Sequence, residues 1–509
     1  MKNLLTLLSI LLIQLVYTQT ILSKEIYENS LPPSAKLSAT QYRQSTKLKY
    51  VKQPKFNLDN DLLISLFDGQ IIRAKYIAQK QHGLSTPTYR YKIEGDNEGT
   101  VFFTDYENWV DGYIITGLGE NFHITKTADQ IYSVLKVNND YFKDEECKSV
   151  KIDSFEEKNN FLGKSMLLHP SVCTSDPCAN SVVDIMVLFS NQTINSVNGG
   201  VPAAKAATLN QVGILNQSLI DSGINNLTFN LVYAEAINHD DLNTNLNDDK
   251  NVIRSGALSA QVNALRDQYG ADLVSIFCKY GTGIGDMSSD PTNFSSSQAY
   301  SAINYDYVMG SLHSLSHELG HNMGMNHEWE TSNSVQPCEH FHGYTNQVVV
   351  QQGAATPADK RWRTTMSYGK ACTDVGISCT RLTRWANPDL LYNGDPMGVP
   401  IGSNHPSDER YGLMRTACIV ANYKSPALGV ENTKDHSNEL AYYPNPVKNK
   451  IFFSDEIKSY TIFNMEGRYI AGSNTKIKDV DVSYLGKGVY IINTILPNNK
   501  KQNFKFIKE

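Results

Sequence analysis

The chain has 509 residues, of which 41% are apolar. That length allows about two to four domains, and the apolar share is large enough to build a core in each. The formal net charge is only −6, from 46 basic and 52 acidic residues. With no long basic run, this balance argues against nucleic acid and anionic membrane surfaces as partners, and it selects no substrate.

The amino terminus has the pattern of a secretory signal. One lysine precedes an apolar run from Leu4 to Tyr17, which is too short and too isolated to span a bilayer. Thr18 and Gln19 stand where small residues usually precede the cleavage point, so the end of the signal is placed only near residue 19. No second apolar stretch approaches membrane-spanning length. We therefore expect no membrane span and a protein that works outside the cytoplasm.

Residues 61–142 form short alternating apolar and polar runs, separated by turns rich in glycine, aspartate and asparagine. This pattern predicts a small β-rich unit. A charged link follows over residues 143–165. From its pattern the block is either an independent domain or a propeptide.

Strands and long helices alternate from residue 181 onward. The hydrophobic periodicity predicts strands over 181–190, 225–237 and 271–280, and helices over 202–223 and 251–270. Such alternation is typical of an α/β layer with a largely parallel sheet. Further helices are predicted over 311–324 and 407–424, with an irregular region between them.

The stretch 317-HELGHNMGMNH-327 carries the chemistry. In a helix, His317 and His321 lie on one face, at the spacing that lets two imidazoles share a metal ion. Gly324 can adopt a left-handed conformation and end the helix, so that His327 returns to the same ion. Glu318 can face the water that completes the metal shell. Three neutral nitrogens and an open position predict a catalytic zinc rather than a closed structural site.

The competing interpretation is that these are surface histidines at a helix end. HExxH alone occurs often by chance, but a glycine and a third histidine at these offsets make that interpretation hard to sustain. His313, one turn earlier, is interpreted as packed or solvent-facing. His340 and His342 are expected to support the lower part of the cleft.

HExxHxxGxxH is the signature of the metzincin zinc endopeptidases, and the chain resembles that family. Metzincins also have a methionine-bearing turn beneath the metal, and 364-TTMSYG-369 supplies Met366, 39 residues after His327. Tyr368 stands where astacin-like and serralysin-like members place a tyrosine that can contact the zinc or the oxyanion. The resemblance therefore implies Met366 as the Met-turn residue and Tyr368 as a transition-state residue or fifth ligand.

Further segments narrow the resemblance. VDIMVLFS, FHGY at 341–344 and NPDLLYNGDPMGVPIG at 387–402 are similar to reprolysin-like bacterial metallopeptidases, including the peptidyl-Asp metalloendopeptidase group, over about 181–424. Glu328 is a departure, because reprolysins usually follow the third histidine with Asp. The family mechanism implies a zinc-activated water, with Glu318 as general base and then acid.

The resemblance also implies structural features. A disulfide is expected between Cys278 and Cys418, while the pairing among the other catalytic-region cysteines is undetermined. A calcium site (Ca²⁺) is expected near Asp184, Asp272 and Asn422.

Arginines flank the Met-turn, where metzincins build the wall of the S1′ pocket. Arg363 and Arg381 are the S1′ candidates, with Arg361 and Arg384 nearby. An arginine in that pocket favours an acidic P1′ residue. The alternative is that all four are ordinary surface arginines.

Eight cysteines occur in the chain, and in an exported protein an even number favours disulfides. Metzincins of this kind are commonly zymogens, so the β-rich block is interpreted as a propeptide that covers the cleft. In some relatives a propeptide cysteine occupies the fourth zinc position, and Cys147, Cys173 and Cys178 are the candidates. None is followed by the usual glycine, and the even count argues against such a switch.

The end of the chain resembles the C-terminal sorting domain of the type IX secretion system of Bacteroidetes. Its markers occur in the expected order: Pro444-Asn445-Pro446, Asn464 with Gly467, Leu485 with Gly488, Tyr490 and a basic tail. The resemblance implies the type IX machinery as a partner and export to the cell surface or the medium. A carbohydrate- or protein-binding β-sandwich is the alternative.

The predicted chain has five parts: a signal peptide at 1–19, a β-rich propeptide at 20–178, a metzincin catalytic domain at 179–424, a linker at 425–441 and a sorting domain at 442–509. The expected fold is α/β (α+β), with a twisted, mostly parallel sheet, an active-site helix and a small C-terminal β-sandwich. The expected function is that of a secreted, monomeric zinc endopeptidase acting on proteins or peptides. A zinc-free relative that acts as an adhesin is the alternative.

Overall fold

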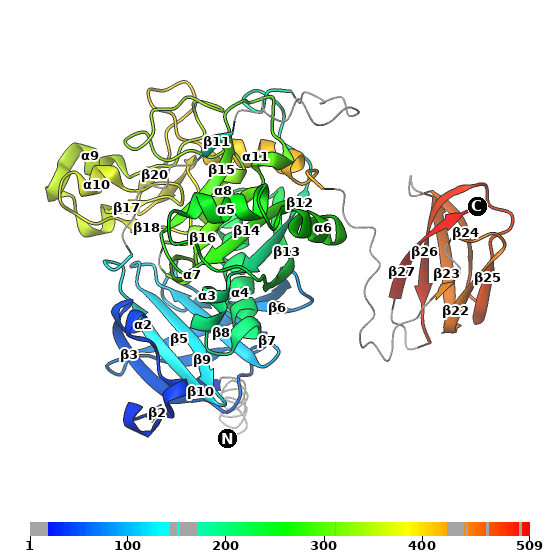
Figure 1. Ribbon diagram of the computed structural model, residues 1–509, viewed down its shortest axis with the longest axis horizontal. Coiled ribbons are helices and arrows are strands. Elements are labelled where there is room, and N and C mark those ends of the chain that lie inside the picture. The colour runs from blue at the N-terminus through cyan, green and yellow to red at the C-terminus, as the bar shows by residue number, and fades with distance from the viewer. Residues whose placement is uncertain are drawn as a thin grey trace, which may run out of the picture. The chain divides into compact units, whose positions relative to one another are not determined.

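The computed structural model describes residues 19–142, 150–152, 170–310, 312–424, 442–443, 446–464, 468–497 and 501–509. The predicted signal peptide, Cys147, the linker and the sorting markers Pro444, Asn445 and Gly467 lie outside these residues, apart from Gln19. The chain divides into two compact units, residues 1–429 and 430–509, which are described separately (Figure 1). Among the described residues, no helix has the length and apolar character needed to cross a membrane.

The amino-terminal part of the first unit is a ten-stranded sheet in the order β1-β4-β5-β6-β7-β8-β9-β10-β3-β2. All its neighbouring strands are antiparallel except β1 and β4. Tyr91, Phe103 and Ile124 lie in its core. The elements are β1 (Gln19–Ile21), β2 (Glu25–Ile26), α2 (Ala39–Arg43), β3 (Ser45–Lys52), β4 (Leu62–Ser65), β5 (Ile71–Gln81), β6 (Pro87–Ile93), β7 (Thr100–Tyr106), β8 (Trp109–Ile115), β9 (Asn121–Ala128) and β10 (Ile131–Val137).

The second sheet of this unit has six strands in the order β11-β15-β16-β14-β12-β13. Strands β13, β12, β14 and β16 are mutually parallel, as the strand–helix alternation predicts, whereas β15 is antiparallel to β16. The short β11 pairs with the outer edge of β15. The strands are β11 (Val150–Ile152), β12 (Ser181–Phe189), β13 (Leu227–Ala236), β14 (Leu273–Cys278), β15 (Gly283–Ser288) and β16 (Tyr300–Asn304).

Helices flank the six-stranded sheet, and α8 lies against β15 and β16. The helix predicted over 251–270 is in fact two helices, because the chain turns at Ser255 and Gly256, where both backbone N–H groups bond back to Asn251. The helices are α3 (Asn191–Ser196), α4 (Gly200–Asp221), α5 (Leu246–Arg254), α6 (Ser259–Tyr269), α7 (Tyr305–Met309), α8 (Ser314–Asn322) and α11 (Glu409–Val420).

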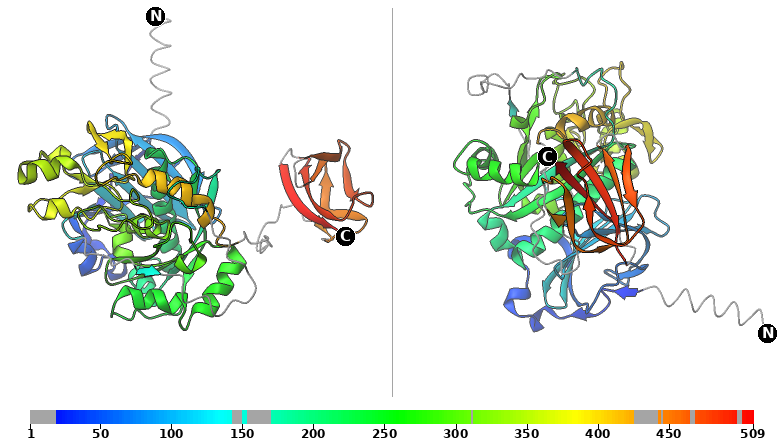
Figure 2. Two further views of the ribbon diagram at one scale, coloured as in Figure 1. Left: turned by 90° about the horizontal axis from the view of Figure 1, so that it is seen from above. Right: turned by 90° about the vertical axis from the view of Figure 1, so that its right-hand side faces the viewer.

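Helix α4 is packed between the two sheets, with β13 on one side and β7 and β8 on the other (Figures 1 and 2). Most of its residues are buried, which accounts for its many small side chains and weak amphipathic pattern. Buried polar contacts join it to the amino-terminal sheet: Asn210 donates to the Asp111 carboxylate at 2.8 Å, and Asn216 bonds His82 at 2.9 Å. The β-rich block therefore belongs to the same compact unit as the α/β sheet.

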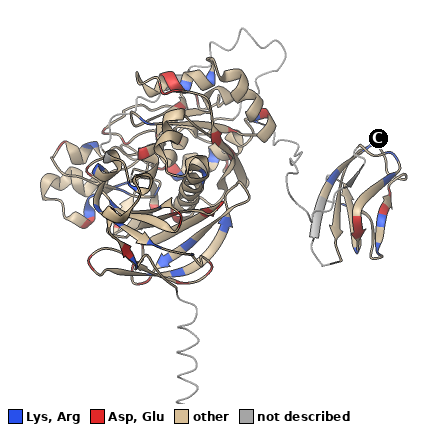
Figure 3. Ribbon diagram, turned by 60° about the horizontal axis from the view of Figure 1, so that its bottom comes forward, with Lys and Arg blue, Asp and Glu red and all other residues tan. Residues whose placement is uncertain are grey.

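A largely irregular region runs from residue 323 to residue 408 and contains only short elements. These are α9 (Gln347–Gln352), β17 (Trp362–Arg363), α10 (Lys370–Thr373), β18 (Thr380–Arg381), β19 (Asn387–Tyr392) and β20 (Asp395–Met397). The Cys372–Cys379 disulfide closes a small loop in it. Basic and acidic residues are interspersed along the ribbon, in keeping with the small net charge (Figure 3).

The expected disulfide between Cys278 and Cys418 is wrong. Cys418, on α11, is bonded to Cys178, and Cys173 is bonded to Cys338. Cys278 is a buried free thiol at the end of β14. The segment before β12 runs alongside α11, where the Cys178 N–H donates to the Met414 carbonyl at 2.8 Å, and this places Cys178 rather than Cys278 beside Cys418. Neither Cys173 nor Cys178 is therefore available as a zinc-binding switch.

The second unit contains two antiparallel sheets with the strand orders β21-β22-β25 and β24-β23-β26-β27. Buried side chains from both sheets, including Phe453, Ile492 and Phe506, form one hydrophobic core. The strands are β21 (Tyr442–Tyr443), β22 (Lys450–Ile457), β23 (Ser459–Asn464), β24 (Tyr469–Ser473), β25 (Ile477–Asp481), β26 (Gly488–Ile495) and β27 (Lys501–Lys508).

Candidate metal centre

Helix α8 ends at Asn322, and the turn that follows has its left-handed residue at Gly324, the glycine predicted to end the helix. Gly324 has φ +91°, and the Met325 N–H returns to the Gly320 carbonyl at 2.9 Å. A Cβ at Gly324 would lie 2.8 Å from the Phe294 ring, so both conformation and space require glycine here. The turn directs the chain back toward α8 and brings His327 beside the helical histidines.

The three histidines meet at their Nε2 atoms. The Nε2 of His327 lies 2.9 Å from that of His321 and 3.3 Å from that of His317. On the opposite side of each helical ring, Nδ1 lies 2.9 Å from a backbone carbonyl, of Thr365 for His317 and of Met325 for His321. A carbonyl can only accept, so each Nδ1 carries the proton and each Nε2 presents a lone pair.

This donor set fits a divalent cation. All three rings are buried, and burial lowers the pKa of His321 to about 4 and those of His317 and His327 well below the usual value. Neutral imidazoles with converging lone pairs repel one another unless a cation lies between them. The three ligand atoms lie within 4.8 Å of one another, and neutral histidine nitrogen is a preferred zinc ligand.

Glu318 lies beside the histidines with its carboxylate against β15. A Cβ at Gly283 would come within 2.2 Å of Glu318 Oε1, and one at Gly285 would come within 2.8 Å of the Glu318 carbonyl and 3.0 Å of the His321 Cβ. Two glycines on β15 therefore allow the strand to approach the metal-binding helix closely. The close contact of Gly283 and Gly285 with Glu318 gave no signal in the sequence.

Met366 is fully buried beneath the histidines and contacts α8 at Gly320. A Cβ at Gly320 would lie 2.4 Å from the Met366 sulfur and 3.0 Å from the Trp385 ring. The turn that carries Met366 also supplies the Thr365 carbonyl that orients His317. The sequence-predicted Met-turn residue thus lies next to the site it was expected to support.

The Tyr368 side chain also borders the histidine site. Its ring centroid is 4.4 Å from that of His327 and 5.2 Å from that of His317. Its backbone N–H donates to Glu328 at 2.8 Å, and the Lys370 N–H donates to the same carboxylate at 3.0 Å. Glu328 is fully buried, so this departure from the family pattern ties the end of the histidine motif to the segment after the Met-turn.

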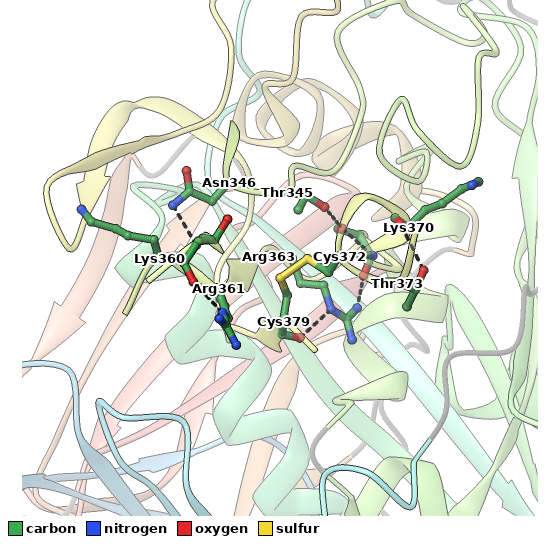
Figure 4. The surroundings of a disulfide bond; sticks show 12 residues. Thr345, Asn346, Lys360, Arg361, Arg363, Lys370, Cys372, Thr373 and Cys379 are labelled. Carbon is green, nitrogen blue, oxygen red and sulfur yellow. Dashed lines mark hydrogen bonds between the residues drawn. A yellow bond between two sulfur atoms is a disulfide. The ribbon is translucent and has the colours of Figure 1, made fainter. Parts of the chain in front are cut away.

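A pocket of about 520 Å³ adjoins Tyr368, and both predicted S1′ arginines line it. Arg381 donates to the Leu312 and Ser367 carbonyls at 2.9 Å, and its guanidinium lies 5.7 Å from the Tyr368 ring centre. Arg363 donates to the carbonyls of Cys379, at 3.1 Å, and Ser367 (Figure 4). Both guanidinium groups are thus held rigidly at the pocket wall.

The other two arginines do not line this pocket. Arg361 donates to the Thr356 carbonyl at 2.8 Å, and Arg384 forms ion pairs with Glu98 and Asp221. His342 contacts the His327 and Ser334 carbonyls through its two ring nitrogens. It therefore holds the backbone of the third histidine in place.

Of the residues expected to bind calcium, Asp184 on β12 and Asp272, just before β14, are in contact, and Asn422 follows α11. The Asp272 carboxylate accepts from the backbone N–H groups of Asp184, at 2.9 Å, and of Lys424, at 3.1 Å. Burial raises the pKa of Asp272 to about 7. Asn422 donates to the Cys418 carbonyl and is exposed. Calcium at these residues stays a prediction.

The amino-terminal block reaches the site at two places. Asn121, Asn139 and Phe142 line the pocket beside Tyr368. Strand β11 pairs in parallel with β15, with Val150 opposite Asp286. The edge of the strand that approaches Glu318 is thereby occupied by the chain's own backbone.

A buried three-histidine site thus lies beside a mixed sheet, with two histidines on helix α8 and the third after the turn at Gly324. Residues 203–328 match the model of the reprolysin-like metallopeptidase family M12B, and residues 441–509 match the secretion system C-terminal sorting domain. The chain thus contains a reprolysin-like metallopeptidase domain, and its sorting domain assigns it to the proteins exported to the cell surface or medium.

Curated relatives agree with this assignment. A peptidyl-Asp metalloendopeptidase of Stenotrophomonas maltophilia (strain K279a) is 25% identical over 50% of this chain and 56% of its own length, and one of Xanthomonas campestris is 24% identical over 48% and 52%. The chain thus spans about half the length of these relatives. A solved chaperone–substrate complex matches 48% of this chain and 35% of its own, with 18% identity and a TM-score of 0.34.

The contact between β15 and Glu318 predicts the effect of a single added methyl group. Gly283→Ala should displace the Glu318 carboxylate and lower any hydrolytic activity by about 100-fold, while the metal content is unchanged, because the histidines are not touched. Peptide hydrolysis and metal analysis on one preparation measure both. Gly486→Ala is the matched control, since its Cβ would meet no atom closer than 3.9 Å. Equal activities for the two variants would contradict the prediction.

Proposed function

We propose that the protein is a secreted zinc-dependent endopeptidase that hydrolyses peptide bonds in proteins, with Glu318 as general base and then general acid. The observation that carries this proposal is the convergence of three buried, neutral histidine nitrogens beside a buried carboxylate. The match to the reprolysin-like family supports zinc as the metal and peptides as the substrate. All ligands and the carboxylate are present, which weighs against an inactive, adhesive relative.

His317, His321 and His327 would hold the zinc ion. When bound, zinc supplies Lewis acidity, which lowers the pKa of water and polarises the scissile carbonyl. Glu318, held against β15, takes a proton from the attacking water and passes it to the leaving amine. Tyr368, whose ring packs edge-on against His327, would donate its hydroxyl to the oxygen that becomes negatively charged.

The pocket beside Tyr368 supports a preference for an acidic residue after the scissile bond. Arg363 and Arg381 bring two positive charges to its wall, and both are oriented by backbone carbonyls. A guanidinium forms a strong, directional bond with a carboxylate. The relatives named peptidyl-Asp metalloendopeptidases support the same preference.

The amino-terminal block is proposed to be a propeptide. An extended substrate could bind by adding a strand to the edge of β15, and β11 takes that position in the full chain. Asn121 and Phe142 also wall the pocket that contains the two arginines. Removal of the block would open both places together.

Glu318→Gln tests the assigned base. The variant should lose about 10²- to 10⁴-fold in turnover, because proton transfer is impaired, and should keep its zinc, because the three histidines are intact. Hydrolysis of casein or a peptide measures the turnover, and metal analysis of the same preparation measures the zinc content. His321→Ala should lose zinc and activity together. Retained peptidase activity in Glu318→Gln would exclude the assignment.

Arg381→Gln tests the acidic preference. In a peptide library, the ratio of kcat/KM for an acidic to an apolar residue after the scissile bond should fall about 10- to 100-fold, because a charge-assisted hydrogen bond is lost. Arg361→Gln is the matched control, since Arg361 does not line the pocket. A purely apolar preference in the natural chain would show that neither arginine selects the substrate.

A cleavable chain tests the propeptide. A recognition sequence for a specific protease is inserted within residues 153–169, and cutting it should raise peptidase activity because β11 can then leave β15. The natural chain treated with the same protease is the control. N-terminal sequencing of the secreted active form gives the native cut. Full activity of a chain whose amino-terminal block is intact and attached would refute the interpretation.

A further inference from the structure

A second cluster of metal-binding side chains lies at the carboxyl ends of the central strands and shares no residue with the histidine site. Asp241 follows β13, Asp249 is on α5, and Cys278 is the last residue of β14. One ligand atom from each lies within 4.8 Å of the other two, and all three residues are buried. The carboxyl ends of parallel strands are a common place for ligands in α/β folds.

Asp241 has an unused buried acceptor in this cluster. Its Oδ2 accepts from the Lys279 N–H at 2.7 Å, whereas its Oδ1 is buried without a hydrogen-bond partner. Only 6% of Asp241 is exposed, so water has little access to this oxygen. The neighbouring Cys278 thiol offers it no more than a weak S–H donor. An unpaired buried carboxylate oxygen is costly, and a cation would satisfy it.

Three donors hold the Asp249 carboxylate in place. His239 Nε2 lies 2.6 Å from one carboxylate oxygen, the Leu242 N–H lies 3.1 Å from the same oxygen, and the Tyr280 hydroxyl bonds the other. Hydrogen bonds to a carboxylate ligand from surrounding groups are typical of protein metal sites. Asp249 is therefore oriented before any ion arrives.

The local charge balance also favours a cation. Two carboxylates are buried together, and the two neighbouring lysines are engaged elsewhere: Lys250 pairs with Asp286 at 2.5 Å, and Lys279 pairs with Asp306. His239 is adjacent to one carboxylate only. The lysines and His239 therefore do not neutralise both carboxylates, which repel each other in the low-dielectric interior. A divalent ion between Asp241 and Asp249 would compensate this negative charge.

We propose that Asp241, Asp249 and Cys278 form a second metal site, with three ligands from the chain, for a borderline divalent cation, with zinc as the best match. A thiolate favours zinc over calcium or magnesium, which prefer all-oxygen shells. Zinc bonds of about 2.1 Å to oxygen and 2.3 Å to sulfur place ligand atoms roughly 3.5 Å apart, so the cluster closes with small side-chain shifts.

Such a site would join three segments that lie far apart in the sequence. It links the loop after β13, the end of β14 and helix α5. The next residue on α5, Lys250, pairs with Asp286 on β15, the strand that carries Gly283 against Glu318. The site is therefore placed to hold the elements behind the metallopeptidase centre, and it does not depend on the proposed function.

Zinc analysis of the full secreted chain tests the proposal. The natural chain should hold about two zinc ions, and Asp241→Asn, which keeps the side-chain size, should hold one. His317→Ala should also hold one, and the double variant none. If Asp241→Asn holds as much zinc as the natural chain, the second site is refuted. If His317→Ala holds as much as the natural chain while Asp241→Asn holds less, the histidine site fails and the second site stands.

Cobalt substitution gives a second readout. Among the described residues the histidine site offers only nitrogen ligands, so a thiolate-to-cobalt charge-transfer band that survives Cys147→Ser reports the second site. Cys278→Ser should abolish the band, and Cys147→Ser, the matched control, should keep it. A natural chain that binds cobalt without the band overturns the proposal, even if Cys278→Ser fails to fold. A band that persists in Cys278→Ser overturns it as well.

Discussion

Three imidazole nitrogens lie within 4.8 Å of one another in a buried site, and much of the surrounding structure serves to hold them there. Neutral rings in such contact are stable only if a hydrogen bond at Nδ1 orients each helical ring and the Nε2 atoms share a cation. The Thr365 and Met325 carbonyls orient the two helical rings, and Gly324 turns the chain so that the third can reach them. The Met-turn packs beneath, so the ligands are connected to the core of the unit.

Close backbone approach is the second constraint around the site. Gly320 lets Met366 and Trp385 touch α8, and Gly283 lets β15 touch the Glu318 carboxylate. Glu328 then ties the third histidine to the Tyr368 segment through two backbone N–H groups. In a densely packed interior each of these contacts restricts the positions of the neighbouring side chains. Substitutions that add a single methyl group at these glycines are therefore expected to lower the rate of the reaction.

Local pattern was enough to predict the convergence of the three histidines, the helix and the turn that ends it, because these depend on residues within one or two turns of chain. The β-rich block and the alternating strands and helices followed from periodicity for the same reason. The disulfide to Cys418 was predicted wrongly, and the helix over 251–270 proved to be two. Spacing along the chain does not tell which of two distant cysteines a fold brings to α11, and a short turn at Gly256 is a weak signal.

The sequence by itself determined the His317–His327 constellation, its carboxylate and the sorting signature, since all of these lie in short contiguous stretches. Only the tertiary structure decided what surrounds them: that Glu328 supports the Tyr368 segment, that Arg363 and Arg381 line one pocket, and that β11 occupies the edge of β15. It also left Cys278 unpaired beside two buried carboxylates. These juxtapositions join residues tens to hundreds of positions apart, and burial and sheet order, not local spacing, bring them together.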